Sequence, residues 1–345
     1  MKKIAKEKLA LLWELLAHKA TLYFPLQEDG AVNFAPWKNG AQVDFGVNSI
    51  VPPKNVFFPQ AETYLRFKTG AKRLQLESVE PEEKFILFGV RPCDLASFNI
   101  LDKIFLEEPT DGLYAKRRRL GTLVSMGCNE PGETCFCTSF ALEPAFAPGA
   151  DVMVWDMGEF LLWEPRSTKG EALTAVINEL LDEAAPEETA AAVRLRDTTA
   201  AGEAAAARQR GWNTEGLQEA LRGKFNDELW EKLYHRCLGC GICTYLCPTC
   251  HCFDIQDFSR DLEGERFSCW DSCMFAEFTL MTSGENPRPT QKERVRQRFL
   301  HKLLYFPSKF GLYACVGCGR CVRKCPVHLD ITQVIKEAGG VVSGS

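Results

Sequence analysis

Hydrophobic patterning divides the chain into two halves of different character. In residues 1–165, short uninterrupted apolar runs alternate with segments of helical periodicity, and the clearest runs are Phe85–Val90 and 120–126. Apolar runs of this length are typical of buried strands, and the segment 95–105 after the first run has the pattern of a helix. We therefore expect residues 1–165 to form an α/β domain.

The second half of the chain has almost no strand pattern. From Asp227 onward, three segments have the pattern of helices: 227–235, 272–281 and 291–305. Before them lies an Ala- and Glu-rich tract, residues 184–207, which is expected to be a helix without chemistry of its own. Residues 166–226 are thus predicted to be a helical connector, and residues 227–345 to be a mainly α-helical domain.

Composition adds one anomaly to this outline. A chain of 345 residues is long enough for two or three domains, and its net charge of −5 provides no basic footprint for nucleic acid. Sixteen cysteines are too few for a small disulfide scaffold, and a chain of this length folds without such crosslinks. The cysteines therefore require a chemical explanation.

The N-terminal segment and the hydropathy pattern favour a cytoplasmic location. The apolar run behind the basic first residues is interrupted by Glu14, and no small-residue cleavage site follows. No stretch approaches the roughly 18 apolar residues of a membrane-spanning helix. We expect no membrane insertion and a reducing cytoplasm, in which thiols bind metals or take part in redox chemistry.

An internal cysteine repeat is the strongest signal in the sequence. Residues 237–248 and 315–326 are identical at seven of twelve positions, and both read C-x2-C-x2-C-x3-C-P. This run binds [4Fe–4S] clusters in bacterial-type ferredoxins, where the fourth cysteine binds the cluster of the other run. The expected ligands are Cys237, Cys240, Cys243 and Cys325 for cluster 1, and Cys315, Cys318, Cys321 and Cys247 for cluster 2.

The alternative to two clusters is two structural zinc sites. Zinc needs only four ligands and has no use for a third cysteine at the same spacing, so the clusters are favoured. Residues 227–345 are then a two-cluster ferredoxin-like domain that relays electrons. A basic stretch either balances the negative charge of the clusters or forms a solvated helix face: Arg288, Lys292, Arg294, Arg296, Arg298 and Lys302.

Four further cysteines lie in the N-terminal half. Cys93 and Cys128 each follow a predicted strand, and Cys135 and Cys137 lie in the loop after Cys128. Open α/β sheets bind ligands at the carboxyl ends of their strands, so we expect these four thiols to hold a third [4Fe–4S] cluster. A redox-active C-x-C pair, a zinc site or inert buried thiols are the alternatives. Pro92 suits a first helical position, and the helix dipole there favours a Cys93 thiolate.

The remaining cysteines are Cys250, Cys252, Cys269 and Cys273. We expect them to pack around the neighbouring clusters. A fourth cluster or a zinc ion, with His251 as a further ligand, is the alternative. A helix is expected to begin near Asp271 or Ser272, just before Cys273.

Motifs for nucleotide cofactors are missing. No G-x-G-x-x-G follows a predicted strand, and neither G-x4-G-K-[ST] nor H-E-x-x-H occurs. The chain therefore has no evident place for nicotinamide or flavin, and partner subunits are expected to carry out the chemistry at both ends of the electron path.

Several rare motifs occur together and in order: Arg91-Pro-Cys-Asp-Leu, Cys128 with Cys135-Phe-Cys137, Cys247-Pro-Thr-Cys-His-Cys-Phe-Asp254, Trp270-Asp-Ser-Cys-Met-Phe275 and Cys315-Val-Gly-Cys-Gly-Arg-Cys321. Together they resemble the 4Fe–4S dicluster family that contains beta subunits of cytoplasmic sulfhydrogenases and the A subunit of anaerobic sulfite reductase. Related subunits occur in flavin oxidoreductase modules of heterodisulfide reductases.

The resemblance implies an iron–sulfur electron-transfer subunit of an oxidoreductase complex. Such a subunit lies beside a ferredoxin-reductase-like partner that binds FAD and NAD(P)H, and it exchanges electrons with a catalytic partner of hydrogenase, sulfite reductase or heterodisulfide reductase type. One alternative is a self-contained reductase that uses the N-terminal cysteine site on a small molecule. Another is a zinc-stabilised scaffold protein.

Overall fold

The computed structural model describes residues 1–46, 48–70 and 72–339. Within these residues, a large mixed sheet has the strand order β10-β1-β9-β8-β7-β6-β2-β3. Its strands are β1 (Lys2–Ala5), β2 (Thr21–Glu28), β3 (Ala31–Pro36), β6 (Phe85–Val90), β7 (Gly121–Met126), β8 (Val152–Asp156), β9 (Phe160–Pro165) and β10 (Asp182–Glu183).

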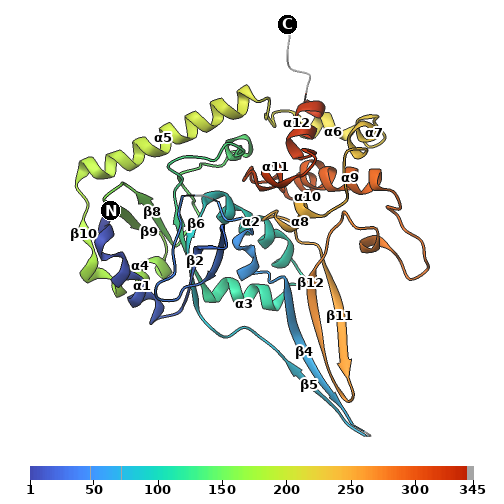
Figure 1. The fold of residues 1–345 in the computed structure, drawn as a ribbon, viewed down its shortest axis with the longest axis horizontal. Helices are drawn as coiled ribbons and strands as arrows, with labels where there is room; N and C mark the ends of the chain where they lie inside the picture. The colour runs from blue at the N-terminus through green and yellow to red at the C-terminus, as the bar shows by residue number, and fades with distance from the viewer. Residues whose placement is uncertain (47, 71, 340–345) are drawn as a thin grey trace.

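Helices cover this sheet and continue into the C-terminal half (Figure 1). They are α1 (Leu9–Ala17), α2 (Pro92–Phe105), α3 (Gly112–Leu120), α4 (Thr168–Val176), α5 (Pro186–Gln209), α6 (Leu217–Arg222), α7 (Leu229–Tyr234), α8 (Ile242–Tyr245), α9 (Gln291–Leu300), α10 (Phe306–Phe310), α11 (Arg320–Lys324) and α12 (Ile331–Gly339). A π-helical turn, η6 (His301–Tyr305), joins α9 to α10.

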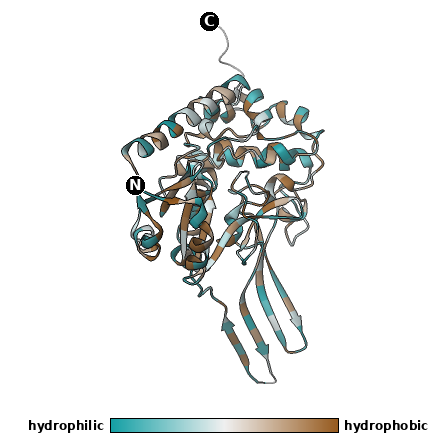
Figure 2. Ribbon diagram, turned by 60° about the vertical axis from the view of Figure 1, so that its left-hand side comes forward, coloured by the Kyte–Doolittle hydropathy of each residue, from teal (hydrophilic) through white to brown (hydrophobic). Residues whose placement is uncertain are grey.

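The centre of the large sheet confirms the α/β prediction. Strands β2, β6, β7 and β8 run parallel, and every residue of β6 is buried. Strands that are buried on both faces read as continuous apolar runs, which is why the sequence pattern located β6 and β7 correctly. Figure 2 shows the hydrophobic residues concentrated in this part of the molecule. Because β6 and β7 are adjacent and parallel, the loops after them leave the same edge of the sheet.

The helix expected over residues 184–207 is confirmed as α5, which runs along one side of the molecule toward the C-terminal helices (Figure 1). It is more than a solvated connector. Glu203 on α5 is only 5% exposed, and its carboxylate accepts a hydrogen bond of 3.1 Å from the backbone amide of Thr138. The helix therefore holds the loop that carries Cys135 and Cys137.

The C-terminal half is helical in part. Helix α7 and the continuous stretch α9–η6 confirm two of the three helices expected there. The helix expected at 272–281 is wrong, since that segment is irregular apart from a single 3-10 turn, Glu277–Thr279. Asp271 accepts from the amide of Ser272, and Ser272 accepts from that of Met274, so these side chains close local turns instead of starting a helix.

The expectation that strands vanish after residue 227 is also wrong. A hairpin of β11 (Phe253–Arg260) and β12 (Glu263–Trp270) pairs with β4 (Ala61–Thr69), which in turn pairs with β5 (Leu74–Ser78). All residues of β11 are exposed, so no alternation of buried and exposed positions marks it in the sequence. The C-terminal half therefore combines a ferredoxin-like helical part with this hairpin.

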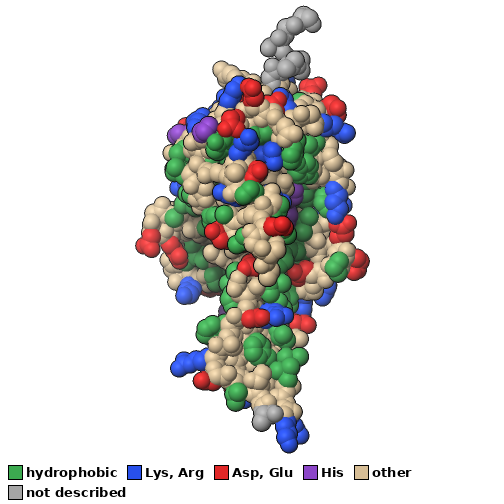
Figure 3. Space-filling model, turned by 90° about the vertical axis from the view of Figure 1, so that its right-hand side faces the viewer, with side chains coloured by type: hydrophobic (Ala, Val, Ile, Leu, Met, Phe, Trp, Pro, Cys, Tyr) green, Lys and Arg blue, Asp and Glu red, His purple; other side chains and the backbone are tan. Residues whose placement is uncertain are grey.

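The four-stranded sheet β11-β12-β4-β5 projects from the body of the molecule (Figures 1 and 3). Figure 3 shows hydrophobic side chains gathered on this arm, and more than half of the surface of Leu74, Leu76, Ile255 and Phe258 is exposed. Among the described residues, none of the helices has the length and apolar character needed to cross a membrane.

Candidate iron–sulfur centres

The two cysteine repeats fold alike. Each repeat ends its first loop with a glycine of positive φ, Gly241 at +72° and Gly319 at +73°, and a short helix follows. The two short helices, α8 and α11, pack against each other. An L side chain is strained at such φ values, so glycine at both positions allows the chain to turn sharply between the second and third cysteines of each run.

The fourth cysteine of the first repeat lies beside the second repeat. Burial raises the pKa of Cys315 to about 12, and the next largest cause is the charge of Cys247. Cys247 also acts on Cys318 and Cys321. This arrangement brings together the four residues expected to bind cluster 2.

The thiols expected to bind cluster 1 are brought together only in part. Cys243 lies close to Cys237 and Cys240. The sulfur of Cys325 accepts a hydrogen bond of 3.2 Å from the amide of Leu329, and its contact with the other three thiols stays a prediction. Among the described residues, no three His, Cys, Asp or Glu side chains lie close enough to share one metal ion. A cubane makes no such demand, because each cysteine binds a different iron.

Three buried basic side chains surround Cys247 and Cys250. Arg298 donates to the carbonyl of Cys243 at 2.8 Å and lies 3.7 Å from the sulfur of Cys250. Lys302, in the π-helical turn, donates to the hydroxyl of Thr249 and to the carbonyl of Ala314. π-Helical turns often occur at functional sites.

The third buried cation is Lys54, which comes from the N-terminal half of the chain. Its ammonium donates to the carbonyl of Cys250 at 2.7 Å and lies 4.0 Å from the centroid of the Trp270 ring. Within the described residues, no carboxylate forms an ion pair with Lys54, Arg298 or Lys302. Buried charges are normally paired or bound to a metal centre, so these three are arranged for negative charge on the thiols.

The basic stretch from Arg288 to Lys302 was expected either to balance cluster charge or to form a solvated helix face, and each expectation holds for some of its residues. Arg298 and Lys302 are buried among the cysteines, where burial opposes their positive charge but the neighbouring thiols raise the pKa of each. Lys292 instead pairs with Glu231 near the surface, and Arg296 lies over the ring of Phe225. No local sequence signal identified Lys54, which reaches this site from a loop far away in the chain.

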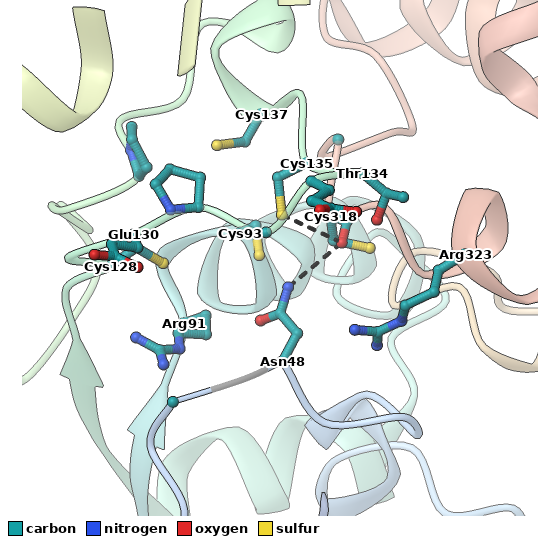
Figure 4. A pocket seen from close by; sticks show the side chains of 16 residues that line it. Asn48, Arg91, Cys93, Cys128, Glu130, Thr134, Cys135, Cys137, Cys318 and Arg323 are labelled. Carbon is teal, nitrogen blue, oxygen red and sulfur yellow. Dashed lines mark hydrogen bonds between the residues drawn. The ribbon is translucent and has the colours of Figure 1, made fainter. Parts of the chain in front are cut away.

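The four N-terminal cysteines line one pocket of about 290 Å³ (Figure 4). Cys93 begins α2 directly after β6, and Cys128 follows β7, so the strand arrangement brings them together as expected. Cys135 and Cys137 enter from the next loop. The same pocket is also lined by Cys318, a thiol of the second repeat.

Close backbone packing explains how Cys318 reaches this pocket. The amide of Phe136 donates to the carbonyl of Gly317 at 2.8 Å. A Cβ atom on Gly317 would lie 2.3 Å from the carbonyl oxygen of Phe136, and one on Gly319 would lie 2.4 Å from that of Thr134. Only glycine at both positions allows the Cys135 loop to lie directly against the second repeat.

A buried ion pair joins the two halves at the same place. Arg320, which follows Gly319, donates to both carboxylate oxygens of Asp94 at 2.5 and 2.7 Å, and it also bonds to Ser49. Both charged side chains are 1% exposed. Asp94 is next to Cys93, so this pair fixes the start of α2 relative to the second repeat. The first repeat has Ile242 where the second has Arg320, a difference in the sequence that the prediction did not use.

The surroundings of the N-terminal thiols favour their neutral form. Burial raises the pKa of Cys93 well above its ordinary value, and the adjacent Asp94 raises it further. The thiolate expected from the helix dipole is therefore not favoured in the protein without metal. Burial also raises the pKa of Cys137, and Glu203 on α5 adds to this effect. Burial raises the pKa of Cys128 as well, and the positive charge of Arg91 lowers it in part.

The last group of cysteines is divided by the structure. Cys250, Cys252 and Cys273 lie together, whereas Cys269 is on β12. His251 is buried beside them, and burial lowers its pKa to about 4. Its Nδ1 is 3.0 Å from the carbonyl oxygen of Thr249.

Comparison with known proteins agrees with this geometry. A family model described as a 4Fe-4S dicluster domain matches residues 236–329, the part that contains both repeats. The chain is thus an iron–sulfur protein of the [4Fe–4S] dicluster class, a class of electron-transfer proteins.

A similar protein extends this result beyond the repeats. The chain is 30% identical over 337 residues to the sulfhydrogenase 2 subunit beta of Pyrococcus furiosus, and the match covers 97% of each chain. It includes the N-terminal cysteine pocket and the projecting arm as well as the dicluster domain. The chain belongs to the family of sulfhydrogenase beta subunits.

Proposed function

We propose that this protein is the iron–sulfur electron-transfer subunit of a multisubunit, cytoplasmic oxidoreductase complex. The observation that carries the proposal is the continuity of cysteine sites, since Cys318 of the second repeat also lines the N-terminal pocket. Bound clusters would supply one-electron transfer at these positions.

The ligand sets follow the crossed arrangement. Cys315, Cys318, Cys321 and Cys247 hold one [4Fe–4S] cluster, and the proximity of Cys247 to the other three supports this set. Cys237, Cys240, Cys243 and Cys325 hold the second. A third cluster is held by the pocket thiols, Cys93, Cys128, Cys135 and Cys137. The donor chemistry fits, because four thiols from three segments of the chain line one cavity.

The side chains around the sites position the thiols and balance charge. Arg298 and Lys302 stabilise thiolates at Cys247, and the Asp94–Arg320 pair holds the N-terminal pocket against the second repeat. Two partner subunits carry out the other reactions of the complex. One is a ferredoxin-reductase-like subunit that binds FAD and NAD(P)H, and the other is a catalytic subunit of hydrogenase, sulfite reductase or heterodisulfide reductase type.

Iron and acid-labile sulfide per chain test the third cluster. The anaerobically purified protein is compared with Cys128→Ser and with Cys269→Ser, a matched change at a thiol outside the proposed ligand sets. We expect Cys128→Ser to lose about four irons and four sulfides and Cys269→Ser to lose none. Equal iron in all three proteins would overturn the third cluster, and a protein that holds zinc without sulfide would overturn the whole proposal.

The pocket itself favours one second candidate, a self-contained reductase. It is open enough to admit a small molecule, and Arg91 and Arg323 line it beside the thiols (Figure 4). Steady-state turnover of a small oxidant by the isolated chain, abolished by Cys135→Ser but not by Cys269→Ser, would favour this function. An isolated chain that accepts electrons without turnover supports the relay.

A further inference from the structure

Three cysteines outside the proposed ligand sets are brought together by the base of a hairpin. Phe253, at the start of β11, pairs with Trp270, at the end of β12. The amide of Asp271 then donates to the carbonyl of Cys252 at 3.0 Å, which extends the hairpin by one more contact. Cys273 follows two residues later, and its thiol lies beside that of Cys252.

Cys250 completes this group from the loop before β11. It lies close to Cys273 and also to Cys247. The three thiols thus come from two segments that are separated in sequence by the hairpin. They meet beside the second repeat rather than on the exposed arm.

Positive charge converges on the same group. Arg298 lies 3.7 Å from the sulfur of Cys250, and its Nε is buried without a hydrogen-bond partner although the side chain is only 3% exposed. Lys54 donates to the carbonyl of Cys250 and acts on the thiols of Cys250, Cys247 and Cys252. A buried, unpartnered guanidinium nitrogen beside three thiols indicates that an anionic group belongs there.

The two repeat clusters explain the positions of only some of these buried cations. Arg298 and Lys302 also lie near thiols assigned to those clusters. Lys54 approaches from the N-terminal half and is packed over the Trp270 ring, and the thiols that act on it are Cys250 first, then Cys247 and Cys252. Two of these three thiols, Cys250 and Cys252, lie outside the ligand sets of the repeat clusters, and the ammonium of Lys54 is held at the backbone carbonyl of Cys250.

We propose that Cys250, Cys252 and Cys273 bind an iron–sulfur centre of their own, whose negative charge Lys54 and Arg298 balance. Among the described residues, no three such side chains converge closely enough to share a single ion, whereas each cysteine of a [4Fe–4S] cluster binds a different iron. The inference rests on the proposed function, because it adds a centre to the same electron-transfer subunit.

Cys269 is excluded from the centre by its place in the sheet. It lies on β12 between Asp254 of β11 and Ala61 of β4, and the charges that act on it are those of Asp254 and Asp271. Two carboxylates beside a thiol disfavour a further anionic group. Cys269 is therefore a matched control for the other three.

The test counts iron, acid-labile sulfide and zinc in the full chain purified anaerobically. Wild type is compared with Cys252→Ser, Cys273→Ser and Cys269→Ser. With three other clusters in place, we expect about sixteen irons in wild type, a loss of about four in each of the first two variants, and no loss in Cys269→Ser. Unchanged iron in Cys252→Ser and Cys273→Ser overturns the proposal, as does zinc in place of the lost iron.

A fourth variant separates this proposal from the proposed function. If Cys318→Ser loses iron while Cys273→Ser does not, only the additional centre is wrong. If wild type contains no iron and sulfide, the proposed function fails as well. Should Cys252→Ser and Cys273→Ser fail to fold, the iron content of Cys128→Ser, which lacks the third cluster, decides the matter: about twelve irons per chain support the additional centre, and about eight overturn it.

Discussion

The two cysteine-rich regions of this molecule use the same ligand in opposite electrostatic surroundings. In the N-terminal pocket, the buried charges are acidic or neutralised, since Glu203 lies near Cys137 and Asp94 pairs with Arg320. Around Cys247 and Cys250, three buried cations have no carboxylate partner among the described residues.

This difference teaches how one chain can set unlike potentials for like centres. Local charge and hydrogen bonds tune an iron–sulfur centre, and nearby positive charge stabilises the reduced, more negative form. We therefore expect a centre beside Cys247 to be easier to reduce than a centre in the N-terminal pocket. The direction follows from buried side chains rather than from the cysteine motifs, which alone do not distinguish the two regions.

The largest expected effect comes from removing a ligand that crosses between the repeats. Cys247→Ser should disturb the same cluster as Cys315→Ser, because Cys247 lies beside the second repeat. Cys325→Ser should instead disturb the cluster that Cys240→Ser disturbs. Electron paramagnetic resonance of the reduced variants measures which signal is lost, and loss of the Cys240→Ser signal in Cys247→Ser would contradict the crossed assignment.

A smaller effect is expected at the ion pair that ties the two regions together. Arg320→Leu leaves Asp94 buried without its partner, which we expect to cost about 3–5 kcal/mol of stability. Chemical denaturation of the anaerobic protein measures this loss of free energy of unfolding.

The double variant Asp94→Leu, Arg320→Leu separates charge from packing. Because it removes both charges, it should be less destabilised than Arg320→Leu alone. If the double variant is as unstable as the sum of the single variants, the pair does not act as a unit, and the rigid contact between the two regions has another origin.

How much of this organisation is readable from the sequence depends on the range of the contacts. Strand β6 and helix α2 were predictable, since their burial and periodicity are local properties of residues 85–105. The cysteine repeats were predictable because ligand spacing is also local. The hairpin of β11 and β12 was not, because β12 pairs with β4 of the N-terminal half and all residues of β11 are exposed.

The same limit applies to the sites. Grouping Cys93 with Cys128 followed from adjacent parallel strands, a rule that the sequence pattern supports. Lys54 was not predictable, because its role arises only when a loop of the first half meets Cys250 of the second. Contacts between a charged side chain and a thiol from distant parts of the chain are thus the feature of the site that only the structure shows.

The smallest of the three effects tests the electrostatic contrast directly. Arg298→Met removes a buried charge close to Cys243, Cys247 and Cys250 while keeping a side chain of similar length. At the effective dielectric constant of a protein, one charge about 7 Å away contributes about 2 kcal/mol, so the midpoint potential of the nearest centre should fall by roughly 100 mV. Redox titration followed by electron paramagnetic resonance measures this shift.

Arg323→Met is the matched change at the N-terminal pocket. Arg323 lines that pocket but is exposed, so water and salt screen its charge and the expected shift is at most about 20 mV. Equal shifts in the two variants would mean that burial of a cation does not decide its effect on the midpoint potential. The predicted order of the two potentials would then lose its basis. A large shift for Arg298→Met alone would establish that the uncompensated cations, rather than the shared cysteine motif, distinguish the two regions.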